Sequence, residues 1–347
     1  MPRPSYARAR AKRYPPTKWG KVTLWAFILL AVSTFTIITT SGIDYQRISG
    51  LNWILNQDKS QSENVQFQQD YPANMEWEEV QQRRVQHMLH ACSSLNLNQT
   101  LDYMVLKHLL VDTRHKTLMC FVPKVACTSW KRLWFWMVGL LQDDDDIMDL
   151  TRAQVHGPLL PNLANTMFPE AKKEEILRTY KKFLFTRHPL DRLISAFSDK
   201  LENSDRESKF DFHKYVGQEV EMMVRGKVTG LGHNVTFPEF IKWVTPPNGT
   251  WTEAQKNEHW RPISELCAPC TVQYNAVGRY ENLEQEMNAT LHWLDVGHYA
   301  RRFPPPDRTF HAAERRHQYL QHLASDDKLR FLRTYLLDFL LFGYDMP

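Results

Sequence analysis

Two short segments of the 347-residue chain place cationic and hydroxyl side chains where a strand turns into a helix. In the first segment, an apolar strand at 118–122 leads through a small-residue turn with Lys124 into a helix that continues to about residue 141. Thr128 and Ser129 fall in the first turn of that helix. Free backbone N–H groups and the helix dipole attract an anion there. The segment predicts a phosphate cradle, although a helix capped by Thr or Ser has the same pattern.

The second segment, residues 181–197, has the same order of strand, turn and helix. Arg187 stands at the end of the apolar strand, Pro189 opens the helix, and Ser195 lies early in the helix. We expect Arg187 and Ser195 to contact one phosphate. Two anion sites, both at the carboxyl ends of strands, indicate a ligand with two phosphates.

These segments resemble the donor-binding motifs of a known enzyme family. Residues 123–132 (PKVACTSWKR) resemble the 5′-phosphosulfate loop of Golgi carbohydrate sulfotransferases, and Arg187 with Ser195 resembles their 3′-phosphate motif. The nearest branch is the chondroitin/dermatan N-acetylgalactosamine (GalNAc) 4-O-sulfotransferases, with their glucuronyl 3-O relatives. The segments NEHWRP, LCAPC and VGRYENL, between residues 257 and 283, also fit that branch. The similarity runs from about residue 90 to the C-terminus. The sequence departs from the family at two positions, because the family more often has Asn where Ser129 stands and an acidic residue where His188 stands.

The resemblance implies a donor and a set of residues that hold it. The donor is 3′-phosphoadenosine-5′-phosphosulfate (PAPS), and no metal is required. Arg192 could hold nucleotide or acceptor, or form a local salt bridge on the helix surface. The predicted donor-binding residues are Pro123, Lys124, Val125, Ala126, Cys127, Thr128, Ser129, Arg187, His188, Pro189, Leu190, Asp191, Arg192, Leu193, Ile194 and Ser195.

Sulfuryl transfer needs charge stabilisation and a base for the acceptor hydroxyl. Lys124 is predicted to act on the 5′-phosphate and the bridging oxygen. His156 and His259 are the candidate bases, because a histidine accepts a proton near neutral pH. We favour His156, because related glycan sulfotransferases carry a histidine just before the strand of the second motif. Either histidine could instead be an ordinary surface or core residue, and His259 could serve only in substrate binding.

Alternating strand and helix patterns predict an α/β fold, a P-loop-like parallel sheet with helices on both faces. Further helices are expected over residues 76–92 and about 169–180. Another is expected over 325–342, capped by Ser325. Residues 205–262 mix helix with Pro/Gly turns and are a candidate acceptor-binding insertion.

The N-terminus is of a different kind. Residues 1–21 form a basic tail without acidic residues, and 22–43 form an uncharged apolar run long enough to span a bilayer. The basic flank predicts a cytosolic tail and therefore a type II signal anchor in the Golgi membrane. Residues 44–75 have the polar composition of a lumenal stem. The catalytic domain is predicted to occupy 76–347.

The net charge of +4 depends on that tail. Seven of the 43 basic residues lie within residues 1–21, which leaves 36 against 39 acidic residues in the remainder. Binding of an anionic glycan therefore has to come from a local basic patch, and a nucleic-acid partner is not expected. The sequence does not decide whether the protein forms a homo-oligomer.

The five cysteines and four sequons fit an oxidising lumen. An odd cysteine count leaves at least one thiol unpaired, and Cys127 is expected to be free. Structural disulfides, with their pairing open, are favoured over a zinc site at Cys267 and Cys270. Glycosylation is expected at Asn98, Asn234, Asn248 and Asn288.

The sequence-based function is sulfuryl transfer from PAPS to a glycan hydroxyl, most directly the 4-hydroxyl of GalNAc in chondroitin or dermatan. The alternatives are the 3-hydroxyl of terminal glucuronic acid, the 4-hydroxyl of terminal GalNAc, and a lumenal glycan-binding protein without turnover. A nucleotide kinase is disfavoured because the chain has no Walker A motif.

Overall fold

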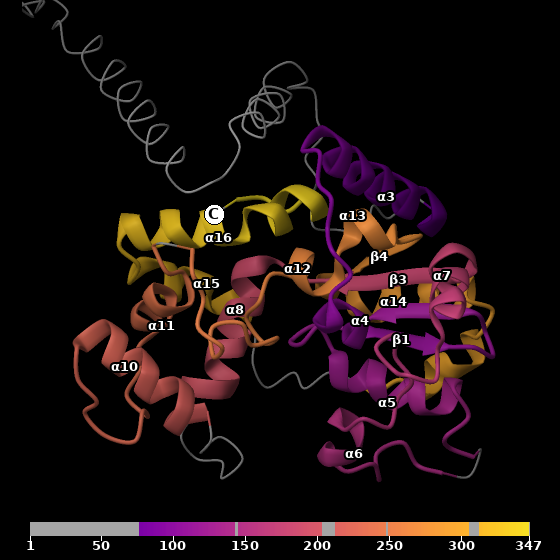
Figure 1. Cartoon of the computed structure of the whole chain (residues 1–347), viewed down its shortest axis with the longest axis horizontal. Helices are drawn as coiled ribbons and strands as arrows, with labels where there is room; N and C mark the ends of the chain where they lie inside the picture. The colour runs from indigo at the N-terminus through magenta and orange to yellow at the C-terminus, as the bar shows by residue number, and fades with distance from the viewer. Residues whose placement is uncertain (1–75, 143–144, 203–211, 248, 305–311, 347) are drawn as a thin grey trace, which may run out of the picture. The chain divides into compact units, whose positions relative to one another are not determined.

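The computed structural model of the chain describes residues 76–142, 145–202, 212–247, 249–304 and 312–346 (Figure 1). The predicted tail, membrane anchor and stem lie outside these residues and stay predictions, as does the sequon at Asn248. Within the described ranges, no helix is both long enough and apolar enough to cross a membrane.

A four-stranded mixed sheet lies at the centre of the described fold, in the order β1-β2-β3-β4. Strands β2 (Thr117–Cys120), β3 (Lys181–Thr186) and β4 (Ala276–Arg279) run parallel. Strand β1 (Leu109–Asp112) pairs antiparallel with β2. The prediction of an all-parallel sheet is therefore wrong at one edge. Only a tight turn joins β1 to β2, and a parallel partner needs a much longer crossover.

Different parts of the chain contact opposite faces of β3. The Trp130 ring centroid lies 5.3 Å from that of Phe183 and 4.9 Å from that of Phe185, two residues whose side chains share a face. On the other face, the Thr186 hydroxyl lies 3.0 Å from the Tyr344 hydroxyl. Because both faces are covered, β3 is buried along nearly its whole length.

The helices nearest the sheet fall into two groups. The contacts with β4 come from α3 and α14, and α3 also contacts α16, as Figure 1 shows above the sheet. Helix α5 packs through its tryptophans on β3, and α6 contacts α5. The bounds are α3 Trp77–Ser94, α4 Tyr103–His108, α5 Cys127–Met137, α6 Arg152–His156, α7 Glu170–Thr179, α12 Ile263–Cys267, α13 Pro269–Val272, α14 Leu283–Trp293 and α16 Ser325–Phe342.

A second set of helices lies to the left of the sheet in Figure 1 and includes the predicted insertion. In this set α15 packs on α8, and α11 contacts both α10 and α16. The bounds are α8 Pro189–Phe197, η1 Ser198–Glu202, η3 His213–Gly217, α10 Gln218–Arg225, α11 Phe237–Val244 and α15 Ala312–Gln321. Two short 3₁₀ segments follow β4, at η4 Tyr280–Asn282 and η5 Gly297–Arg302.

One predicted helix end and one predicted helix cap are wrong. Helix α5 ends at Met137 instead of near residue 141, because Gly139 adopts φ +78° and its N–H bonds back to the Trp136 carbonyl. A glycine in this left-handed conformation terminates a helix. Helix α16 does start at Ser325, but its capping position is Ala324 and no side chain caps it.

Two disulfides confirm that the cysteines form structural cross-links. Cys92 pairs with Cys270, and Cys120 pairs with Cys267, which leaves Cys127 as the free thiol. Cys267 and Cys270 are therefore not zinc ligands, and that alternative is wrong. The first bond ties α13 to α3, and the second ties the last residue of α12 to the end of β2, beside the first predicted cradle.

Candidate active site

The first cradle is a strained turn between β2 and α5. Lys124 has φ +70° and Ala126 has φ +52°, both in the left-handed region that non-glycine residues rarely adopt. Ala126 occupies the capping position of α5 and no side chain caps that helix. The N–H groups of the first turn, at Cys127, Thr128 and Ser129, therefore stay available to a ligand. Backbone strain of this kind is concentrated at ligand-binding sites.

The second cradle contacts the first directly. Arg187 follows β3, is 6% exposed, and donates from Nη1 to the Lys124 carbonyl at 2.9 Å. Its guanidinium also stacks 4.2 Å above the Tyr280 ring. Pro189 opens α8 as predicted, and Ser195 lies half-buried on that helix. The two predicted cradles are thus joined by a hydrogen bond between residues 63 positions apart.

Two charged residues that the sequence did not single out complete the surroundings of Lys124. Lys124 Nζ lies 3.1 Å from Asp199 Oδ2, and Lys200 Nζ lies 3.2 Å from the same oxygen. Burial alone would raise the pKa of Asp199, but the two lysines outweigh it and lower that pKa. Both residues lie on η1, a π-helical turn directly after α8. Such turns are frequent at functional sites, but no local sequence signal revealed this one.

His156 lies against the first cradle. Its Nε2 is 3.2 Å from the Thr128 hydroxyl, and it also lines a cavity of about 400 Å³. Helix α6 presents it, with a capping box formed by Thr151 and Gln154. Desolvation of the ring, followed by the charges of Lys131 and Arg152, lowers the pKa of His156 to about 4. The ring is therefore neutral at neutral pH and can accept a proton.

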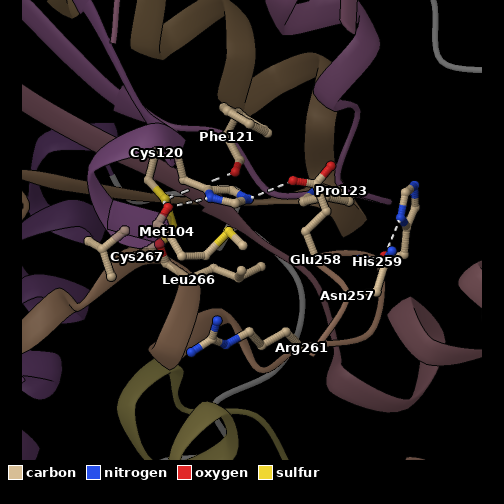
Figure 2. A network of polar contacts seen from close by, with 12 residues as sticks. Met104, Cys120, Phe121, Pro123, Asn257, Glu258, His259, Arg261, Leu266 and Cys267 are labelled. Atoms are coloured by element: carbon tan, nitrogen blue, oxygen red, sulfur yellow. Dashed lines mark hydrogen bonds and ion pairs between the residues drawn. A yellow bond between two sulfur atoms is a disulfide. The ribbon is translucent and has the colours of Figure 1, made fainter. Parts of the chain in front are cut away.

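His259 is half-buried in the segment that carries the Asn-Glu-His-Trp-Arg-Pro motif. Its Nδ1 lies 2.7 Å from Asn257 Oδ1 (Figure 2). Because an amide oxygen only accepts, Nδ1 carries the proton and the Nε2 lone pair is left for another donor. Burial, followed by the charge of Lys200, lowers the pKa of His259 to about 3. Its ring is neutral as well.

Glu258, next in the chain to His259, turns its side chain the other way (Figure 2). Its Oε2 lies 3.2 Å from Nε2 of the fully buried His108, whose Nδ1 is 2.8 Å from the Met104 carbonyl. Burial would raise the pKa of Glu258, but the hydrogen bond and charge of His108 hold it at about 2. Glu258 is therefore an ionised structural partner of His108.

The structure contradicts one of the two roles predicted for Arg192, the local salt bridge on the helix surface. It is 2% exposed, not on the helix surface, and it donates to three main-chain carbonyls. Nε bonds to Pro123 at 3.0 Å, Nη1 to Arg261 at 2.7 Å and Nη2 to Glu258 at 2.8 Å. The Arg192 side chain thus fixes the first cradle against the segment that holds His259.

Several other predicted donor-binding residues have side chains that are paired with other residues or buried in the core. Asp191 forms a bidentate ion pair with Arg316, both contacts at 2.7 Å. His188 is 1% exposed and its backbone N–H donates to Glu281 at 2.7 Å. The remaining side chains that belong to the core are Val125, Leu190, Leu193 and Ile194. A ligand could reach only the main chain of these four.

The sequons at Asn98, Asn234 and Asn288 lie on exposed residues. Their glycosylation stays a prediction. No group of three or more His, Cys, Asp or Glu residues that could hold a metal ion occurs among the residues that the structure describes.

Comparison with known proteins finds close relatives. Residues 107–345 match the family described as the sulfotransferase family. Carbohydrate sulfotransferase 11 of Rattus norvegicus is 35% identical over 248 residues, which cover 70% of this chain and 68% of the relative. Carbohydrate sulfotransferase 14 of Homo sapiens is 36% identical over 251 residues (70% and 61%), and carbohydrate sulfotransferase 8 of Mus musculus is 30% identical over 285 residues (78% and 64%). No solved structure matches.

Proposed function

Because the chain belongs to the sulfotransferase family of enzymes, we propose that it transfers a sulfuryl group from PAPS to the 4-hydroxyl of GalNAc in chondroitin or dermatan. The relatives are named carbohydrate sulfotransferases, which supports a glycan acceptor. The observation that carries the proposal is the hydrogen bond from Arg187 to the Lys124 carbonyl, because it joins two anion cradles into one site.

The residues of the two cradles fit a nucleotide with two phosphate groups. The uncapped start of α5, the Lys124 ammonium and the hydroxyls of Thr128 and Ser129 would hold the 5′-phosphosulfate. The buried Arg187 and the half-buried Ser195 would hold the 3′-phosphate, with the bidentate geometry that arginine provides. When bound, PAPS supplies the sulfuryl group.

Each residue of the site has one task in the transfer. Lys124 Nζ places a positive charge where negative charge develops on the departing phosphate oxygen. Asp199 holds that ammonium at 3.1 Å and so orients it before the donor arrives. His156 Nε2 accepts the proton that the sugar hydroxyl loses as its oxygen bonds to sulfur.

His156 is the proposed base because it contacts the Thr128 hydroxyl of the first cradle and lines the cavity beside it. His259 is the competing candidate, since the Asn257 contact leaves its Nε2 unprotonated. Single substitutions of the two histidines separate these alternatives.

The proposed setting is the Golgi lumen, with the chain anchored as a single-pass type II membrane protein by residues 22–43. Both disulfides support this setting, because such bonds persist in oxidising compartments and are rare in the cytosol.

The test uses the full-length protein in detergent with sulfate-labelled PAPS and a panel of acceptors. The panel holds desulfated chondroitin, dermatan, heparosan, and oligosaccharides ending in glucuronic acid or GalNAc, with disaccharide analysis of the products. Label at the 4-position of internal GalNAc is the expected result. Label on another sugar would replace the acceptor assignment, and tight PAPS binding without any label would favour the glycan-binding alternative.

A further inference from the structure

The cavity beside His156 has a chemical character that the donor does not explain. It has a volume of about 400 Å³, within the range of ligand-binding pockets. The polar groups that line it come from Tyr103, Lys107, Lys131, His156, Asn162 and Asn165. None of the residues that line it is acidic. The cavity is therefore cationic, with amide and aromatic groups on its wall.

Lys131 is the unusual member of this wall. It is 7% exposed, and its Nζ lies 3.6 Å above the centre of the Phe121 ring. It has no hydrogen bond or ion pair with any residue that the structure describes. Burial lowers the pKa of Lys131 as a result. A buried ammonium without an anionic partner is costly, and a ring face compensates for only part of the lost hydration.

The carboxylate that acts on Lys131 does so without an ion pair between the two side chains. Glu258 acts on Lys131 through its charge, but its Oε2 is bound to His108 at 3.2 Å. Lys107, also at the cavity, adds a second positive charge and makes no ion pair among the described residues. Among the residues that the structure describes, neither lysine has an ion-pair partner, so the cavity presents two ammonium groups to an anionic ligand.

The other lining groups suit a sugar that carries such an anion. Asn165 uses its carbonyl oxygen to accept from the Met167 N–H, which leaves its NH₂ group to donate. Tyr103 is 70% exposed and offers a ring face to a sugar ring. His156 connects the cavity to Thr128 of the first cradle at 3.2 Å. An anionic sugar in the cavity would therefore be a close neighbour of the sugar that receives the sulfuryl group.

We propose that this cavity, the Lys131 pocket, binds the carboxylate of a uronic acid in the acceptor, and that Lys131 sets the preference for uronate-containing over neutral glycans. The inference rests on the proposed function, since it concerns the acceptor of the same reaction. It adds a specificity-determining residue on α5, two positions after the last predicted donor-binding residue of the first cradle.

The test compares full-length wild type with Lys131→Met, which keeps most of the unbranched side chain and removes the ammonium above the Phe121 ring. The acceptors are desulfated chondroitin and the same polymer with its carboxyl groups reduced to hydroxymethyl groups. We expect the variant to lose about 10- to 100-fold in kcat/KM on chondroitin, mainly through KM, because a hydrogen bond to a charged group is lost. On the reduced polymer, wild type and variant should be equal. Lys172→Met, at a half-buried position of α7 where the ammonium pairs with Glu175, is the matched control.

Three results would overturn the inference. The first is an equal loss on both polymers, which indicates general damage. The second is weakened PAPS binding in Lys131→Met, which assigns the lysine to the donor. The third is no loss at all.

The test of the Lys131 pocket can fail or succeed independently of the proposed sulfuryl transfer. If wild type sulfates none of the acceptors, calorimetric binding of a chondroitin hexasaccharide to wild type and Lys131→Met decides the inference alone. Affinity that depends on Lys131 and on the carboxyl groups would keep the pocket assignment while the proposed reaction fails.

Discussion

Arg187 donates a 2.9 Å hydrogen bond from Nη1 to the main-chain carbonyl of Lys124, across 63 residues of sequence. One guanidinium therefore serves both cradles: it supplies positive charge to the second and fixes the left-handed turn of the first. The strained backbone of Lys124 is supported from outside its own loop, which is how unfavourable turns persist in a folded protein.

This relationship predicts that Arg187→Lys is not a conservative change. A lysine keeps the charge but cannot both reach the Lys124 carbonyl and bind phosphate with two parallel bonds. We expect PAPS affinity to fall by about 10- to 100-fold in Arg187→Lys and by at least as much in Arg187→Ala. Equilibrium binding of PAPS or its product nucleotide measures this. Wild-type affinity in the lysine variant would show that charge alone is sufficient.

Arg192→Met should destabilise the fold. The change leaves the carbonyls of Pro123, Glu258 and Arg261 without their buried donor, and each unsatisfied group costs roughly 1–3 kcal/mol. We expect a loss of about 3 kcal/mol or more in the free energy of unfolding, measured by urea denaturation. Arg83→Met is the control, because Arg83 forms only an exposed pair with Glu79. Equal stability of the two variants would contradict the role assigned to Arg192.

The choice of base is tested by two alanine variants. His156→Ala should lower kcat by about 10² or more while PAPS affinity is kept, since a general base contributes to the chemical step. His259→Ala should affect acceptor KM more than kcat. Initial rates with saturating PAPS measure both parameters. If only His259→Ala loses kcat in this way, the base assignment moves to His259.

The stability of the protein should fall as the pH is lowered from 7 to 5, in part through His188. Burial, followed by the charge of Arg316, lowers the pKa of His188 to about 4. The unfolded chain, with an ordinary histidine pKa near 6.5, binds the proton first, so stability is lost as pH falls below that value. At pH 5, protonation of His188 in the unfolded chain lowers the free energy of unfolding by about 2 kcal/mol.

Urea denaturation of wild type and His188→Gln at pH 7 and pH 5 measures this effect. The variant should retain a smaller pH dependence, because His156 and His259 also have lowered pKa values in the folded state. An unchanged pH dependence in His188→Gln would mean that the buried ring does not contribute.

Local sequence patterns were sufficient for much of the site. The small-residue turn at Lys124, the strand end at Arg187 and the proline at the start of α8 each specify a strand, a turn and a helix through nearby residues only. The free thiol at Cys127 was predictable from the odd cysteine count and its place in the loop. The involvement of the other cysteines in disulfides was predictable from the expected oxidising compartment. The pairing of Cys92 with Cys270 was not.

What only the tertiary structure decided depends on residues far apart in the chain. Arg192 was expected to hold nucleotide or acceptor, or to form a local salt bridge on the helix surface. Its N–H groups instead donate to carbonyls 66 to 69 positions away, and burial of the side chain makes each of those bonds necessary. The ion pair of Lys124 with Asp199 and the Lys131 pocket arise in the same way. A sequence pattern reports which residues follow one another along a helix or strand. Charge pairing, burial and cavities depend on which elements pack together, and that is settled by the whole fold.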